Sequence, residues 1–293
     1  MPKENLEEKE NGVSKMASQP SFEKMPGFHR LESLWMIEYK AVSREPMITA
    51  PAEEEAKIEV EKLLDKRLAK TYPDLVPLIF EGHAAFSGNA VKGLFRHLIS
   101  SQLTNAGVRV CVQKVKLGGK KEQPPEGRTP QCRPEDPCFV CTWFGTPSRQ
   151  GALHFSFLKS VKPFKEVLAE NPIPMVALSD EFMGVSERAF LLVVPLKPGT
   201  EFRGWIKGEN LSREIIGAIK EVVDMSKAGF VQFGALKTRG FGAMELEILS
   251  VEKYSTRPFQ LEKKYAGSDL EDFLKECQGE YHRLLRPAGA QRQ

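Results

Sequence analysis

The cysteines of this chain are grouped in a way that favours metal binding. Cys138 and Cys141 are separated by two residues, a spacing that lets both thiolates bind one tetrahedral zinc ion, and Cys132 lies shortly before them. Gly, Pro, Lys and Glu dominate residues 118–137, so this segment has little apolar surface with which to fold itself. We therefore predict a structural, non-catalytic Zn²⁺ site with these three cysteines as ligands.

The fourth zinc ligand has several candidates. Cys111 offers a soft thiolate just before the same loop. His97 is favoured over it, because it directly follows the basic face of a predicted helix and would tie that helix to the loop. His83 and His154 are weaker candidates, since a lone histidine is more often a surface or core residue than a ligand. The alternative to a metal site is a set of reduced thiols in a surface loop.

A glycine-rich segment near the carboxyl end is a candidate phosphate contact. Gly234-Ala-Leu-Lys-Thr-Arg-Gly-Phe-Gly242 places three glycines around two cations. Glycines let a backbone approach a phosphate closely, and its N–H groups can form an anion-binding nest. The same glycines also fit a tight, solvated turn. The residues expected to make contact are Gly234, Lys237, Thr238, Arg239 and Gly240.

A second candidate phosphate contact opens a predicted helix. Ser87, Gly88 and Asn89 stand at its start, and Asn89 is the expected N-cap. A helix N-terminus offers free N–H donors and positive potential to a phosphate or sugar oxygen. Lys92 and Arg96 follow four residues apart and so share one face of the helix. The alternative is an N-capped helix whose cations only extend into solvent.

The elements that must position these residues follow from hydrophobic periodicity and turn residues. Strands are expected over 34–42, 108–115, 153–158, 190–196 and 244–251, and helices over 53–70, 89–103, 211–227 and 268–285. The order is strand, helix, strands, then strand, helix, glycine-rich loop and strand. This order predicts an α+β, ferredoxin-like (RRM-like) core with insertions and a zinc-binding loop.

Composition sets the remaining limits. Residues 1–27 are polar and we expect a disordered tail, followed by one domain over 28–260 with its zinc loop at 117–145 and a helical extension over 261–293. The net charge of +3 does not by itself argue for nucleic-acid binding, so any such surface must be local. We find no apolar run long enough for a membrane span and no signal peptide, and expect a cytoplasmic protein.

Three ordered motifs together resemble those of the RAMP superfamily. Gly88-Asn-Ala-Val-Lys-Gly-Leu-Phe-Arg96 is similar to that family's helix start, the segment 234–242 to its glycine-rich loop, and Cys138-Phe-Val-Cys141 with Trp143-Phe-Gly145 to a C-x-x-C-x-x-F-G element of type III backbone subunits. The resemblance implies a subunit that grips CRISPR guide RNA along its backbone in a type III effector complex. Its implied partners are guide RNA, target RNA, other RAMP subunits and a large polymerase/cyclase-like subunit.

The resemblance also implies a candidate catalytic residue. In this family, backbone subunits cleave target RNA with an aspartate on a loop before the first motif, assisted by a divalent cation. Asp74 stands in a similar segment here, with one extra residue, so it is the candidate for Mg²⁺- or Mn²⁺-dependent endoribonuclease activity. An aspartate that follows a proline in a loop is, on the other hand, most often a turn residue.

Two other functions fit parts of the pattern. A free-standing endoribonuclease that processes repeat RNA would need a general acid and base, but His29 and His83 are isolated in the sequence. A zinc-bearing interaction subunit without RNA contact would bind its partners regardless of salt and of the candidate lysines and arginines. The sequence does not specify the guide, the copy number or the subunit's position in a complex.

Overall fold

The computed structural model describes residues 30–51, 75–111, 129, 131–133, 135–147, 149–178 and 185–286. Its core has the strand and helix order of a ferredoxin-like fold. The six steps of that order are β1 (Ser33–Ser43), α2 (Gly88–Asn105), β6 (Leu153–Phe155) with β7 (Leu158–Pro163), β10 (Glu201–Glu209), α5 (Arg213–Lys227) and β11 (Met244–Thr256). The predicted fold class is thereby confirmed.

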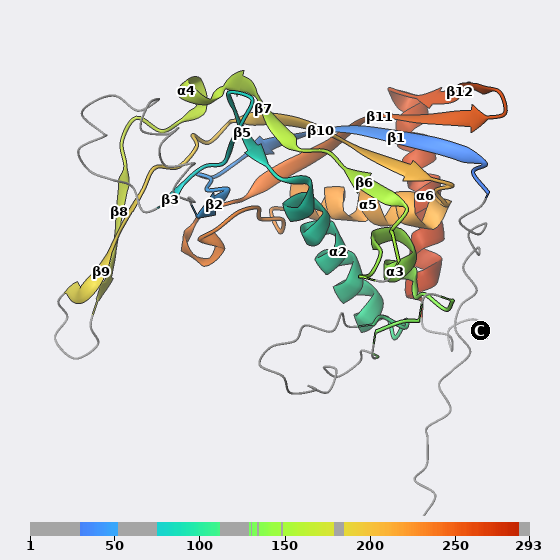
Figure 1. Ribbon diagram of the computed structural model, residues 1–293, viewed down its shortest axis with the longest axis horizontal. Helices are drawn as coiled ribbons and strands as arrows, with labels where there is room; N and C mark the ends of the chain where they lie inside the picture. Colours follow the sequence, from blue (N-terminus) through green and yellow to red (C-terminus); the bar gives the residue numbers. More distant parts are fainter. Residues whose placement is uncertain are drawn as a thin grey trace, which may run out of the picture.

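These strands belong to one antiparallel sheet. Its order is β12-β11-β1-β10-β7-β5-β4, and β6 pairs with β10 beside β7. The additional members are β4 (Ile79–Phe80), β5 (His83–Phe86) and β12 (Phe259–Tyr265). A second sheet, ordered β2-β3-β9-β8, contains β2 (Ala50–Pro51), β3 (Leu75–Val76), β8 (Ile173–Leu178) and β9 (Val185–Val193). The hairpin of β8 and β9 extends away from the main sheet (Figure 1).

The helices gather on one face of the main sheet (Figure 1). Besides α2 and α5 they include α3 (Phe139–Phe144) and α6 (Ser268–Leu285), while the short α4 (Phe164–Val167) follows β7. Along β1 the side chains of Trp35, Ile37, Tyr39 and Ala41 are buried and alternate with more exposed ones, as expected for a strand covered on one face. The core therefore lies between the sheet and these helices.

The observed elements also correct parts of the prediction. The helix spanning 89–103 begins one residue earlier and its N-cap is Ser87 rather than Asn89. A strand was expected over 108–115, but residues 108–110 form no strand. Cys111 forms an isolated β-bridge with Thr129. The expected helix over 53–70 lies outside the described residues, as does the tail over 1–27.

The sequence analysis missed several strands, among them β10 and β12. Strand β10 lies at the centre of the sheet, and β12 pairs with β11 at its edge. The boundary expected between residues 260 and 261 falls inside β12, and α6 buries Phe273, Cys277 and Tyr281 in the main core. Helix α6 is thus part of the same core as the preceding elements, whereas residues 259–264 of β12 are exposed. Within the described ranges, no helix combines the length and apolarity needed to cross a membrane.

Candidate nucleic-acid interface and metal centre

Two segments that are far apart in sequence meet in one groove. One side is the face of α2 formed by Ala90, Gly93, Leu94 and His97, whose spacing of three and four residues places them together. The other side is the start of the glycine-rich loop. The groove encloses about 380 Å³, and its other lining residues are Thr49, Phe86, Gln232, Phe233, Gly234, Ala235 and Lys237. None of these described lining residues is acidic, so the groove suits an anionic ligand.

Close packing holds the loop against the start of α2. The rings of Phe86 and Phe233 lie 5.5 Å apart in an edge-to-face arrangement, which joins the residue before the N-cap of α2 to the residue before the loop. Gly234 has a φ of +80°, and a Cβ there would lie 1.9 Å from the carbonyl oxygen of Ile48. The amide of Ala235 donates to that same carbonyl at 2.9 Å. Gly234 therefore serves the close approach of two backbones.

The predicted cationic residues of the loop form an exposed turn. Lys237–Arg239 form a 3₁₀ turn between Leu236 and Gly240, both of which have left-handed backbone conformations. The side chains of Lys237, Thr238 and Arg239 are exposed, and no ion pair with another described residue engages the two cations. Their charges are consequently available to a bound anion at the mouth of the groove.

Two of the residues at the start of α2 stabilise the fold. The Ser87 hydroxyl accepts a hydrogen bond from the Ala90 amide at 3.2 Å and so caps the helix. A Cβ at Gly88 would lie 2.4 Å from the carbonyl oxygen of Phe155, which means that this glycine lets the helix start pack on the end of β6. Asn89 is exposed at the first turn.

Lys92 and Arg96 lie on a different face of α2 from the groove. Neither residue lines it, since their positions on the helix are rotated away from Gly93 and His97. Burial, with repulsion from Arg96, lowers the pKa of the half-buried Lys92. The Arg96 guanidinium donates to the carbonyl oxygen of Gly145 at 2.8 Å. Arg96 thereby links α2 to the segment that follows the cysteines, a contact that the sequence analysis did not foresee.

Four cysteines converge beneath α2. The sulfur atoms of Cys111, Cys132, Cys138 and Cys141 all lie within 4.8 Å of one another, and those of Cys111 and Cys141 are 3.1 Å apart. With Zn–S bonds of about 2.3 Å, tetrahedral geometry would place the sulfurs about 3.8 Å apart, close to this arrangement. Four soft donors in such a group suit zinc. The cluster could therefore hold one metal ion.

Helix α3 delivers two of these sulfurs to the cluster. It begins after Cys138 and carries Cys141, while Phe139 and Trp143 on the same short helix are buried in the core. The Arg109 side chain pairs with Asp136 at 2.6 Å and lies 3.9 Å from the Cys132 sulfur. Apolar packing and one ion pair thus fix the ends of the cysteine loop.

The thiols of this cluster differ in acidity. Hydrogen bonding with Cys141 lowers the pKa of Cys138 to about 5, and the same contact raises the pKa of Cys141. Burial raises the pKa of Cys132 to about 11. Zinc binds the thiolate form of cysteine, so binding of a divalent ion would release the protons that the thiols carry.

His97 is not part of the cysteine cluster, which corrects the preference for it as the fourth ligand. It is exposed on the groove face of α2, whereas Cys111 completes the four sulfurs. The segment 108–111 leaves the end of α2 and passes beside α3, and this path brings Cys111 to the other cysteines. The candidate catalytic residue Asp74 lies outside the described residues.

One comparison with known proteins shows a family. A family model described as the RAMP superfamily matches residues 81–245, more than half of the chain. No curated protein matches. Among solved structures, a chain from "Cryo-EM structure of the Type III-B Cmr-beta bound to cognate target RNA" is 14% identical, with a TM-score of 0.46. The match covers 76% of this chain and 61% of that chain, so this chain spans about three fifths of its length.

Proposed function

This chain belongs to the RAMP superfamily, and from that membership we propose that it is an RNA-binding subunit of a type III CRISPR effector complex. It would form part of the backbone along the guide RNA. Its proposed partners are guide RNA, target RNA, other RAMP subunits and the large polymerase/cyclase-like subunit. The same proposal includes Mg²⁺- or Mn²⁺-dependent cleavage of target RNA through Asp74.

The observation that carries RNA binding is the groove between α2 and the glycine-rich loop. Two segments separated by about half of the chain line it together, and its described lining residues include a histidine and a lysine but no acid. The exposed cations Lys237 and Arg239 stand in the turn at its edge. Such a site would contact the sugar-phosphate backbone, which makes binding independent of RNA sequence.

The cysteine cluster has a structural part in this proposal. Zn²⁺ bound by Cys111, Cys132, Cys138 and Cys141 would fix the loop that follows α2. Because Arg96 joins α2 to Gly145, just after the cluster, the metal would also hold the helix that lines the groove. Residues 28–260 with the zinc loop 117–145 would act as the RNA-binding unit, stabilised by α6.

RNA binding is tested by removing the two cations of the turn. The double variant Lys237→Ala/Arg239→Ala should bind single-stranded RNA more weakly, because two phosphate contacts are lost. The slope of log affinity against log salt should fall by about 1.4, given about 0.7 per phosphate contact on a single strand. Affinity is measured by fluorescence anisotropy over a range of salt concentrations.

A matched control removes the same charge elsewhere. Lys165→Ala/Lys275→Ala changes two exposed lysines on α4 and α6, away from the groove. It should leave both the affinity and its salt slope near those of the unchanged protein. Equal behaviour of the two double variants would overturn the proposed site, because binding would then reflect net charge alone.

A further inference from the structure

A second cavity lies at a break in the main sheet, apart from the α2 groove. It encloses about 600 Å³ and shares no lining residue with the groove. Ser156 and Phe157 occupy the two positions between β6 and β7, the two strands that pair in turn with β10. The size falls within the range typical of small-ligand sites, about 300–1,000 Å³.

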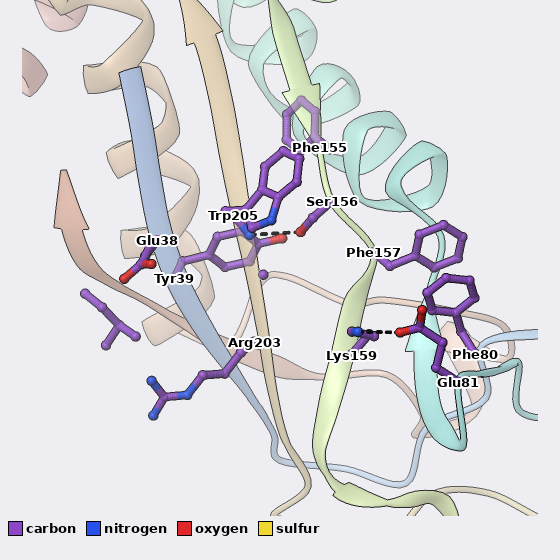
Figure 2. A pocket seen from close by; sticks show the side chains of 12 residues that line it. Glu38, Tyr39, Phe80, Glu81, Phe155, Ser156, Phe157, Lys159, Arg203 and Trp205 are labelled. Atoms are coloured by element: carbon purple, nitrogen blue, oxygen red, sulfur yellow. Dashed lines mark hydrogen bonds and ion pairs between the residues drawn. The ribbon is translucent and has the colours of Figure 1, made fainter. Parts of the chain in front are cut away.

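Aromatic side chains form the walls of this cavity. Phe80 and Phe157 stack with ring centroids 4.3 Å apart and an interplanar angle of 10°, and Phe157 remains 37% exposed. Trp205 stands on the opposite side (Figure 2), where the Lys207 ammonium lies 4.3 Å from its ring. An aromatic pair of this kind, left open to solvent, offers a flat surface on which another π system can stack.

The polar groups of the cavity suit a base with a phosphate attached to it. Lys159 and Arg203 are the cations of the wall. Lys159 is paired with Glu81 at 2.8 Å, and Arg203 with Glu201 at 3.0 Å. The exposed Glu38 carboxylate can accept a hydrogen bond from an amino group or a ring N–H. Because both signs of charge are present, the cavity is suited to one nucleotide rather than to a free anion.

A buried hydroxyl without a partner points to a missing ligand. Tyr39 is only 2% exposed, it lines the cavity, and its hydroxyl makes no hydrogen bond. Gly204 is paired with Tyr39 in the sheet, and a Cβ there would lie 3.1 Å from the hydroxyl and 3.0 Å from the Ser156 Oγ, so the glycine makes space for the tyrosine itself. Figure 2 shows the hydroxyl directed toward Ser156. A buried, unsatisfied donor of this kind is costly, which favours a partner in the bound state.

We infer that this cavity, defined by Tyr39, Phe80, Phe157, Lys159 and Trp205, binds one unpaired nucleotide of a single-stranded RNA. The base stacks on the exposed face of Phe157, and the phosphate lies toward Lys159 and Arg203. This inference rests on the proposed RNA-binding function but places a second contact away from the α2 groove. A protein segment as the occupant is the alternative that the experiment below distinguishes.

The inference is tested by ultraviolet crosslinking of short single-stranded RNA to the full chain, with the crosslinked peptides mapped by mass spectrometry. Crosslinks are expected at Phe157 or Trp205 as well as at the glycine-rich loop. Phe157→Ala should lower RNA affinity about 10-fold, within the range for one stacked base. Phe230→Ala, which removes a 75% exposed phenylalanine outside the cavity, should not change affinity.

A second variant separates ligand binding from folding. Tyr39→Phe removes only the hydroxyl, so it should weaken RNA binding while the melting temperature stays the same or rises, because an unsatisfied buried group is lost. A lowered melting temperature with unchanged RNA affinity would instead assign the hydroxyl to folding and overturn its role.

The outcomes also separate this inference from the proposed function. Crosslinks confined to the α2 groove, with normal affinity of Phe157→Ala, would overturn the nucleotide cavity and leave the proposed function intact. Such a result would make a protein segment the better occupant. No crosslink and no affinity for RNA anywhere on the chain would overturn both.

Discussion

At the scale of single residues, the identity of the fourth ligand decides whether the cysteine cluster is a structural or a catalytic metal site. Cys132, Cys138 and Cys141 follow from their spacing, but Cys111 is twenty-one residues before the next cysteine. Its contact with the Cys141 sulfur at 3.1 Å places it in the group. A site with four cysteine ligands has no open position, so it is expected to be structural rather than catalytic.

Substitution of the two competing ligand candidates tests this assignment. Cys111→Ser should lower the zinc content of the purified protein and its melting temperature, because one of four thiolates is lost. His97→Ala should leave both unchanged, since His97 lies on the groove face. Zinc is measured by elemental analysis and melting by circular dichroism. A zinc loss in His97→Ala alone would restore the histidine as a ligand.

Alanine substitutions of Lys92 and Arg96, on the other face of α2, are expected to lower the free energy of unfolding by different amounts. Arg96→Ala removes the charged hydrogen bond to Gly145 and should cost about 1–3 kcal/mol of unfolding free energy. Lys92→Ala should cost little, because burial already disfavours its charge, as its lowered pKa shows. Urea unfolding of both variants provides the comparison. Equal midpoints would show that the Arg96 contact contributes no stability.

At the scale of elements, the close crossing of α5 and α6 explains why the carboxyl-terminal helix belongs to the core. A Cβ at Gly217 would lie 2.1 Å from the carbonyl oxygen of Cys277, so the two helices approach as closely as a glycine permits. Tyr281 on α6 donates to the Gln102 side chain of α2 at 2.9 Å. Helix α6 thereby connects both helices of the ferredoxin-like core.

Two glycine substitutions test this crossing against helix propensity. Gly217→Ala should destabilise the protein by about 1–3 kcal/mol, because the new methyl group forces the two helices apart. Gly279→Ala, on the exposed face of α6 with nothing within 4 Å, should stabilise it by about 0.5–1 kcal/mol. Thermal or urea unfolding measures both. An unchanged free energy of unfolding in Gly217→Ala would contradict the close packing of α6 on α5.

At the scale of the whole molecule, the proposed cleavage of target RNA is tested in the assembled complex rather than in the isolated chain. If Asp74 assists attack on a target phosphodiester with Mg²⁺ or Mn²⁺, Asp74→Ala should abolish cutting at the positions served by this subunit without loss of RNA binding. The assay follows a labelled target RNA with the reconstituted complex and either metal. Undiminished cutting at every position would reject the role of Asp74.

The sequence by itself determined the fold class, the two long carboxyl-terminal helices and three of the four sulfurs. Amphipathic periodicity marked α5, and α6 begins and ends where predicted, at 268 and 285. Strand β10 was missed although Phe202 and Ile206 alternate there with Arg203, Trp205 and Lys207, because Gly204 and Gly208 weaken the apolar pattern. The features that were predicted, namely the fold class, the two helices and the three cysteines, depend on local spacing in the sequence.

Only the tertiary structure decided which residues share a site. The separation of His97 from the cysteines, the contact of Arg96 with Gly145 and the cavity around Tyr39 all depend on how distant segments pack. A helix has several faces, and the sequence does not state which face meets the glycine-rich loop. Packing of Phe86 on Phe233 settles that orientation, and it turns His97 toward the groove and Arg96 toward the loop that carries the cysteines.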